Sequence, residues 1–162
     1  MAITSYLSRV IYKKHTGSLK NVDFAGTYNL LLAAKSIPSP TSAPNMVEST
    51  TTEDDTQTYE MGIKQTDSKE FTGNLDKDDF DRLLTVGNQK CCIIQLYGTD
   101  GIGGTAKAAY VGQITPTIND IGGVDEIVDM TATVAQNTAP KWVTDDLTIV
   151  DNGDGTFTVT TV

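Results

Sequence analysis

CCIIQLY, at residues 91–97, is apolar at six of its seven positions. Because successive side chains of a strand point to opposite faces of a sheet, this run predicts a central strand that is covered on both faces. Cys91 and Cys92 are the only cysteines of the chain, and as neighbours on a strand they face opposite ways. We therefore expect two reduced thiols and no disulfide. We also expect no metal site, because one histidine and two adjacent cysteines lack the spacing that zinc requires.

Two amphipathic strands are expected on the C-terminal side of this run. After a glycine-rich loop at residues 98–106, apolar and polar side chains alternate over residues 109–118 and again over 127–135. Two glycines place the turn between these strands at residues 119–125. The end of the chain, about residues 145–162, predicts a hairpin, because the Asp-Asn-Gly-Asp-Gly turn at 151–155 separates two further alternating segments.

One amphipathic helix is expected on the N-terminal side, at about residues 76–87. Asp76 opens it, acidic side chains in the first turn favour the positive end of the helix dipole, and a glycine follows the last turn. Phe80, Leu83 and Leu84 have the i, i+3, i+4 spacing of an apolar stripe. We expect these three side chains to form the core of the helix against the sheet.

Further upstream, residues 58–63 and 70–75 alternate in polarity and, with the polar stretch 64–69 between them, predict a hairpin. The apolar run at residues 28–34 is followed by prolines, which lack a backbone donor and cannot lie in the interior of a sheet. A long connection is therefore expected at about residues 38–56, although residues 47–52 also fit an edge strand. Long ordered loops are usually functional or assembly elements. This loop carries Pro38, Pro40, Pro44, Glu48, Glu53, Asp54 and Asp55.

The first 25 residues predict a basic N-terminal arm. Residues 3–11 fit one face of a short helix, whereas residues 8–12 also fit a strand. In both cases an apolar face has basic edges, formed by Arg9, Lys13 and Lys14. A segment of this kind suits docking on another surface.

Composition indicates a single folded domain that is mostly β. The chain has 162 residues, of which 38% are hydrophobic and 25 are threonine, a residue that suits a half-wet sheet face. In all, seven or eight strands and one helix are expected. No apolar run reaches the roughly 18 residues of a membrane span, and the first 14 residues lack the apolar stretch of a secretory signal, so we expect a soluble protein.

The charge is acidic and unevenly distributed. The net charge of −9 argues against duplex binding, which depends on displacing phosphate counterions. Residues 1–35 carry five basic side chains and one acidic side chain, whereas residues 91–162 carry two basic and nine acidic side chains. This polarity fits either a solvated acidic surface with a basic arm or head-to-tail attraction between copies.

Catalytic chemistry is poorly supported. His15 has no nucleophile motif beside it, and the glycine-rich stretch 98–107 lacks the Gly-Lys-Ser/Thr ending of a phosphate-binding loop. The 151–155 turn lacks the alternating ligands and closing glutamate of a calcium loop. The aspartates of the helix lie on its wet side. We therefore expect no enzyme, no catalytic residue and no cofactor, with scattered catalytic residues as the small remaining alternative.

The order of segments resembles the major tail tube proteins of long-tailed bacteriophages. An apolar strand that ends in prolines (residues 28–44) is followed by VESTTTEDD (47–55), QTYEMGIK (57–64) and KEFTGNLDKDDF (69–80). The resemblance covers about residues 28–135. It implies an antiparallel β-sandwich or partly rolled barrel with one flanking helix, six copies of which close into a ring. Stacked rings then form a hollow tube that surrounds a tape-measure protein and later conducts DNA.

By this resemblance the long connection and the termini reach neighbouring rings. The residues expected at such contacts are Arg9, Lys13, Lys14, Pro38, Pro40, Pro44, Glu48, Glu53, Asp54 and Asp55. The implied partners are other copies of the chain, the tape-measure protein, the tail terminator and distal tail proteins, with no membrane and no specific DNA binding. The implied location is the virion, after synthesis in the host bacterial cytoplasm.

Two alternatives stay open at the level of sequence. A tail terminator or another ring-forming tail protein would stop at a single ring. An immunoglobulin-like or other β-sandwich adhesion module explains the threonine-rich strands equally well, and it predicts a monomer with a ligand. The long proline-rich and acidic connection fits such a module less naturally.

Overall fold

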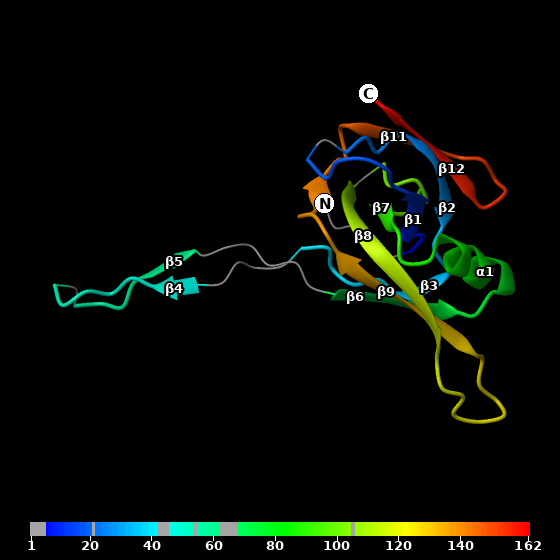
Figure 1. The fold of residues 1–162 in the computed structure, drawn as a ribbon, viewed down its shortest axis with the longest axis horizontal. Helices are drawn as coiled ribbons and strands as arrows, with labels where there is room; N and C mark the ends of the chain where they lie inside the picture. The colour runs from blue at the N-terminus through cyan, green and yellow to red at the C-terminus, as the bar shows by residue number, and fades with distance from the viewer. Residues whose placement is uncertain (1–5, 21, 42–45, 54, 62–67, 105) are drawn as a thin grey trace.

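A computed structural model describes residues 6–20, 22–41, 46–53, 55–61, 68–104 and 106–162. These residues form a curled antiparallel sheet, a half-barrel with one flanking helix, as Figure 1 shows. The expected mainly β, rolled architecture is confirmed. The elements are β1 (Arg9–Lys14), β2 (Gly26–Leu30), β3 (Ala34–Ser36), β4 (Met46–Glu48), β5 (Tyr59–Met61), β6 (Ser68–Asn74), α1 (Lys77–Val86), β7 (Lys90–Tyr97), β8 (Ala106–Ile118), β9 (Asp129–Gln136), β10 (Lys141–Trp142), β11 (Leu147–Asp151) and β12 (Thr156–Thr161).

The main sheet has β7 near its centre. Its strand order is β11-β12-β2-β1-β7-β8-β9-β6-β3. The short strand β10 lies off this path and pairs with β8 at Ala108 and Ala109. The expected central strand at residues 91–97 is confirmed, because β7 pairs with β1 on one side and with β8 on the other. β4 and β5 form a separate two-stranded sheet.

Two hydrophobic clusters cover the two faces of β7. We call them the helix-side cluster, which contains Leu83 of α1, and the hairpin-side cluster, which contains Phe157 of the β11–β12 hairpin. The buried members of the helix-side cluster are Val10, Tyr12, Leu31, Leu32, Phe71, Leu83, Cys91, Ile93, Tyr110, Ile114, Met130, Ala132 and Val134. Those of the hairpin-side cluster are Ile11, Phe24, Tyr28, Cys92, Ile94, Leu96, Ala109, Val111, Val143, Leu147, Ile149, Phe157 and Val159.

The α1 helix has the ends that its sequence predicts. The Asp76 side chain accepts hydrogen bonds from two backbone N–H groups of the first turn, and Gly87 follows the last turn with a φ of 64°. Leu83 is fully buried and Phe80 packs at the edge of the same cluster. The expectation for Leu84 was wrong, because this side chain is 56% exposed. It lies about 100° around the helix from Leu83, which turns it away from the sheet.

The N-terminal segment is a strand in the sheet interior. Residues 9–14 form β1 between β2 and β7, and Val10 and Ile11 are fully buried. Of the two interpretations left open by the sequence, the strand is therefore the one observed over these residues. The docking arm is wrong for the same residues, because their apolar side chains are already covered within the chain.

The hairpin expected from residues 58–63 and 70–75 was also wrong. β5 pairs with β4, whereas β6 pairs with β9 and β3. The alternation around Tyr59 marks no buried face, because all three residues of β5 are exposed. In β6, Phe71 lies opposite Ala132 of β9 and is fully buried. The burial of that face selects β9 as the neighbour of β6.

The two C-terminal hairpins match their prediction. β8 pairs with β9 and β11 pairs with β12, both antiparallel. β8 is 13 residues long and changes neighbours along its length. Gly112 lies opposite both Cys91 of β7 and Gln136 of β9. A Cβ atom there would lie 2.7 Å from Val134, so the close approach of β9 requires glycine at this position.

The described residues contain more strands than the seven or eight expected. Twelve are present. β5 lies within the strand expected at residues 58–63, and β4 overlaps the edge strand left open at 47–52, whereas β3 and β10, of three and two residues, were not expected. Strands as short as β3 and β10 carry too little periodicity to be recognised from sequence. The one helix among the described residues has 10 residues, too few to cross a membrane.

Candidate assembly surfaces

The most prominent projection is the β4–β5 hairpin, which we call the arm. Figure 1 shows it extending away from the curled sheet. Its register pairs Met46 with Met61 and Glu48 with Tyr59, which places these four side chains on one face. Toward its turn, Ser49 donates its backbone N–H to Thr58 at 2.9 Å.

The arm has an uncovered apolar face. Met46 is 70% exposed and Met61 is 77% exposed, with Tyr59 also exposed beside them. A two-stranded hairpin on its own is marginally stable in water. An exposed apolar face of this kind is typical of protein surfaces that dock on another surface.

The long connection divides between the arm and the body. Glu48 lies in β4, and Glu53 and Asp55 are exposed farther along the arm. Pro38 is half-buried and Pro40 is buried, and the Pro40 carbonyl accepts a hydrogen bond from Gln136 Nε2 at 3.4 Å. Pro44 and Asp54 lie outside the described residues. Glu48, Glu53 and Asp55 thus lie on the projection, whereas the first two prolines belong to its root.

Two of the three basic residues of β1, Arg9 and Lys13, are engaged within the chain. Arg9 Nη1 lies 3.0 Å from Asp151 Oδ2, and the guanidinium group also stacks over Phe157. Lys13 donates to the Ala25 carbonyl and lies over the Tyr28 ring. Lys14 is exposed at the end of the strand. The ion pairs among the described residues do not join these basic side chains to the acidic residues of the arm.

A second projection lies at the far end of β8. The connection from β8 to β9 at residues 118–127, which we call the tip, extends beyond the body in Figure 1. Its side chains are largely exposed, among them four branched aliphatic ones. These are Ile118 at 56%, Ile121 at 68%, Val124 at 101% and Ile127 at 70% exposed. Three exposed acidic residues, Asp120, Asp125 and Glu126, lie among them.

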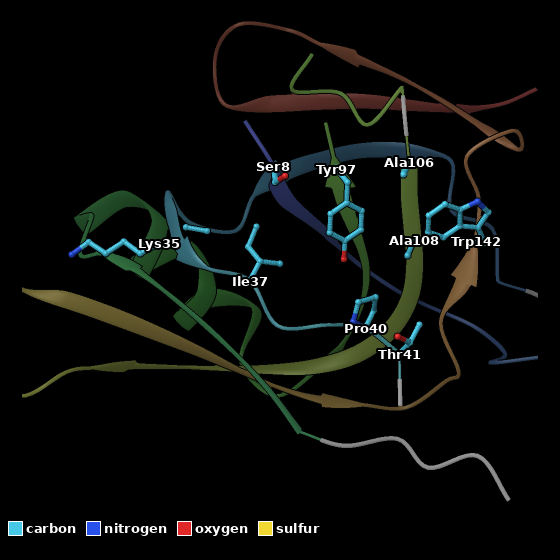
Figure 2. Close-up of a pocket in the computed structure, with 10 residues that line it drawn as sticks. Ser8, Lys35, Ile37, Pro40, Thr41, Tyr97, Ala106, Ala108 and Trp142 are labelled. Atoms are coloured by element: carbon cyan, nitrogen blue, oxygen red, sulfur yellow. The ribbon is translucent and has the colours of Figure 1, made fainter. Parts of the chain in front are cut away.

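A groove of about 610 Å³ lies on the helix side of the sheet, at the opposite end of β8. Figure 2 shows Tyr97 between Ile37 and Trp142, with its hydroxyl pointing toward Pro40. Ala106 and Ala108 of β8 line the wall, and Ser8 and Lys35 lie at the margin. Trp142 is 66% exposed, so much of an aromatic surface faces the groove opening.

A buried polar network supports the floor of this groove. Gln95 is fully buried, and its Nε2 donates to the Tyr110 hydroxyl at 3.0 Å. The Tyr97 hydroxyl donates to Gln95 Oε1. Burial raises the pKa of Tyr97 to about 12, so its hydroxyl remains a neutral donor at physiological pH. The network fixes the Tyr97 ring within the groove.

The curled sheet ends at two open edges. β3 pairs only with β6, and β11 pairs only with β12, among the described strands. Beyond Gln113, β8 is paired with β9 alone within the described part of the chain. Unpaired N–H and C=O groups at such edges are templates for adding a strand from another molecule.

No family model and no curated protein matches the chain. The assignment of surfaces therefore depends on the geometry of the chain and on the segment order described above.

The backbone donors of the glycine-rich loop after β7 are occupied by a carboxylate of the same loop. The Asp100 carboxylate accepts hydrogen bonds from the backbone N–H groups of Ile102, Gly103 and Gly104 at 3.0 to 3.2 Å. Lys107 donates to the Gly103 carbonyl at 2.9 Å. A phosphate would have to displace Asp100 from these donors, so the loop is not a vacant phosphate cradle.

His15 lies beside a thiol that is poorly suited to catalysis. Its Nδ1 is 3.6 Å from Cys92 Sγ. Burial raises the pKa of Cys92, although Lys13 and Tyr28 oppose the shift, and the side chain has no exposed surface. A thiol that keeps its proton and cannot reach solvent is a weak nucleophile.

The tip and the groove were not recognised from the sequence. The tip was expected only as a turn, yet aliphatic residues recur through its glycine- and acid-rich segment, and that recurrence is the available signal. For the groove, the lone tryptophan in the polar stretch around residue 142 is the available signal. Its walls come from segments far apart in the chain, which no local pattern brings together.

Proposed function

We propose that this chain is a structural subunit that assembles with copies of itself into stacked rings, forming the hollow tail tube of a bacteriophage. The observation that carries the proposal is the arm, whose apolar Met46 and Met61 side chains project from a body that already has a complete core. Such a projection suits insertion between neighbouring copies. Its place in the chain matches the long connection of the tail tube proteins that the sequence resembles.

The body supports the same proposal. A half-barrel with open edges at β3 and β11 leaves backbone donors and acceptors for lateral pairing. Closing copies into a ring removes those edges, as closure does in a barrel. Six copies per ring follow from the family resemblance. In this proposal the subunit contacts the tape-measure, terminator and distal tail proteins and lies in the virion.

The charge suits a conduit for DNA. With a net charge of −9, a closed ring repels phosphate and lets the duplex slide without specific binding. We expect an acidic lumen. The Asp-rich hairpins and loops of the second half of the chain are its expected source, because residues 91–162 carry nine acidic and two basic side chains.

A binding module is the second candidate, and the groove beside Tyr97 and Trp142 is the observation that favours it. A concave site lined by apolar and aromatic side chains is typical of ligand recognition. This candidate predicts a monomer that gains thermal stability when its ligand is added. The arm has no evident role in it.

Negative-stain electron microscopy of the untagged chain, over a concentration and salt series, distinguishes these functions. Its mass in solution is measured in the same samples by light scattering. Long hollow tubes support the tail-tube proposal, whereas uniform single rings support a terminator. A chain that stays monomeric under every condition contradicts both ring-forming functions and favours the binding module.

A further inference from the structure

We propose that the tip of one copy docks in the groove of a second copy. The proposal depends on the self-assembly proposed above and specifies one of its contacts. It concerns the β8–β9 connection, residues 118–127, and is independent of the arm. Three properties of the described residues support it: surface chemistry, position along β8 and charge.

The two surfaces have matching chemistry. The tip presents Ile121, Val124 and Ile127, which are 68%, 101% and 70% exposed. The groove presents Ile37, Pro40, Tyr97, Ala108 and Trp142 around a volume of about 610 Å³. Branched aliphatic side chains at a narrow projection fit an apolar concave site, and the contact removes water from both surfaces.

Their positions favour contact between copies. β8 begins at Ala106 in the groove wall and ends at Ile118, where the tip begins. A strand of 13 residues spans about 40 Å. The tip therefore cannot reach the groove of its own chain. It reaches the groove of a second copy that is displaced along the direction of β8.

This contact joins two different surfaces, so it does not close on itself between two copies. Each copy would use its tip toward one neighbour and its groove toward the other. A heterologous contact of this kind generates rings or open filaments, depending on the rotation between copies. Displacement along β8 thus suits repeated stacking and does not suit an isolated pair.

The charges of the two surfaces are opposite. Asp120, Asp125 and Glu126 are exposed on the tip. At the groove, the exposed side chain of Lys35 lies on the margin. Its Nζ pairs with Asp129 Oδ1 of its own chain at 2.8 Å, yet 49% of the Lys35 side chain stays exposed and can meet an acidic side chain of the tip. This complementarity selects a second copy of the chain as the occupant of the groove.

Cysteine linking tests the contact in the full-length chain. One variant carries Val124→Cys on the tip and another carries Ser8→Cys at the groove, while Cys91 and Cys92 are fully buried in both. Mild oxidation of the mixed variants is expected to produce a disulfide-linked dimer that dithiothreitol separates. The matched control replaces Ser8→Cys with Thr148→Cys, an exposed position on β11.

A charge exchange tests the same contact without cysteine. Lys35→Glu is expected to reduce linking to the level of the Thr148→Cys control, and adding Asp125→Lys on the partner variant is expected to restore it. Val124→Asp is expected to abolish assembly without changing the thermal unfolding midpoint, because Val124 has no buried surface to lose.

The outcomes separate this proposal from the tube function. Tubes without the Val124–Ser8 link overturn tip docking and leave the tube function standing. The link without rings or tubes supports tip docking and overturns the tube function, and the absence of both overturns both. Equal linking of Val124→Cys to Ser8→Cys and to Thr148→Cys overturns tip docking. If Met61→Cys of the arm links to Ser8→Cys and Val124→Cys does not, the occupant is the arm and the proposal is wrong.

Discussion

Cys91 and Cys92 are consecutive residues of β7, yet their side chains lie in different hydrophobic clusters on opposite faces of the sheet. Neither has any exposed surface. Burial raises the pKa of the Cys91 thiol to about 11, and it also raises the pKa of Cys92. The accessibility of the two thiols therefore shows whether both faces of the sheet are intact.

Both thiols are expected to resist labelling in the folded chain. Because each thiol is buried and protonated, 5,5′-dithiobis(2-nitrobenzoic acid) should react only when the sheet opens. The reaction is followed by absorbance in buffer and in increasing urea, with the fully unfolded chain as the reference for two thiols. Rapid reaction of either cysteine in buffer alone would contradict the two-sided burial of β7.

Leu83→Ala is expected to lower the free energy of unfolding by about 2 to 5 kcal/mol, because it leaves a cavity in the helix-side cluster. Leu84→Ala is the matched control on the same helix, and its effect should stay within about 0.5 kcal/mol, since Leu84 is largely exposed. Urea unfolding of the two variants followed by circular dichroism measures both values. Equal losses would show that the helix packs in a different rotation.

The sequence was sufficient where a local pattern determines the structure. Asp76 and the glycine after α1 define the ends of the helix through hydrogen bonds and backbone conformation that depend on a few neighbouring residues. The apolar run at residues 91–97, interrupted only by Gln95, identified the centre of the sheet, since only a strand covered on both sides needs such a run. The 151–155 turn likewise produced the β11–β12 hairpin.

The sequence was insufficient where contacts between distant segments determine the structure. The position of β1 depends on burial between β2 and β7, and its basic flanking residues suggested an arm. The partner of β5 depends on the chain reversing within the long connection, which residue periodicity does not encode. The groove combines Ile37, Tyr97 and Trp142 from three separate segments. Such surfaces require the sheet order before they can be recognised.

Stability is expected to fall in alkaline solution. Burial raises the pKa of Cys91 from 9.0 to about 11 and that of Tyr97 from 10.0 to about 12. Between these values the folded chain retains protons that the unfolded chain has released. The free energy of unfolding is therefore undiminished below about pH 9 and decreases as the pH rises toward 12.

Urea unfolding at pH 8, 9.5 and 10.5 measures this decrease. Tyr97→Phe is the control, because phenylalanine does not titrate and the variant should show a shallower dependence on pH than the native chain. If the free energy of unfolding stays constant over this pH interval, the titration of buried thiol and phenol groups does not affect the stability of the chain.

Removal of the arm is expected to abolish assembly and leave the body folded. The variant replaces residues 46–61 with two glycines and keeps the root of the connection, because Pro40 is buried and accepts a hydrogen bond from Gln136. The arm belongs to a separate two-stranded sheet, so the thermal unfolding midpoint should match that of the native chain. Negative-stain electron microscopy and sedimentation velocity should then show monomers under the conditions in which we expect the native chain to form tubes.

A second variant separates the apolar face of the arm from its length. Met46→Ser combined with Met61→Ser keeps both strands and their register but removes the exposed apolar pair. If burial of these side chains between copies drives the contact, this variant should raise the concentration needed for assembly, because less apolar area is removed from water. Tubes of normal length from the deletion variant would show that the arm is dispensable, and assembly would then depend on the sheet edges and the tip alone.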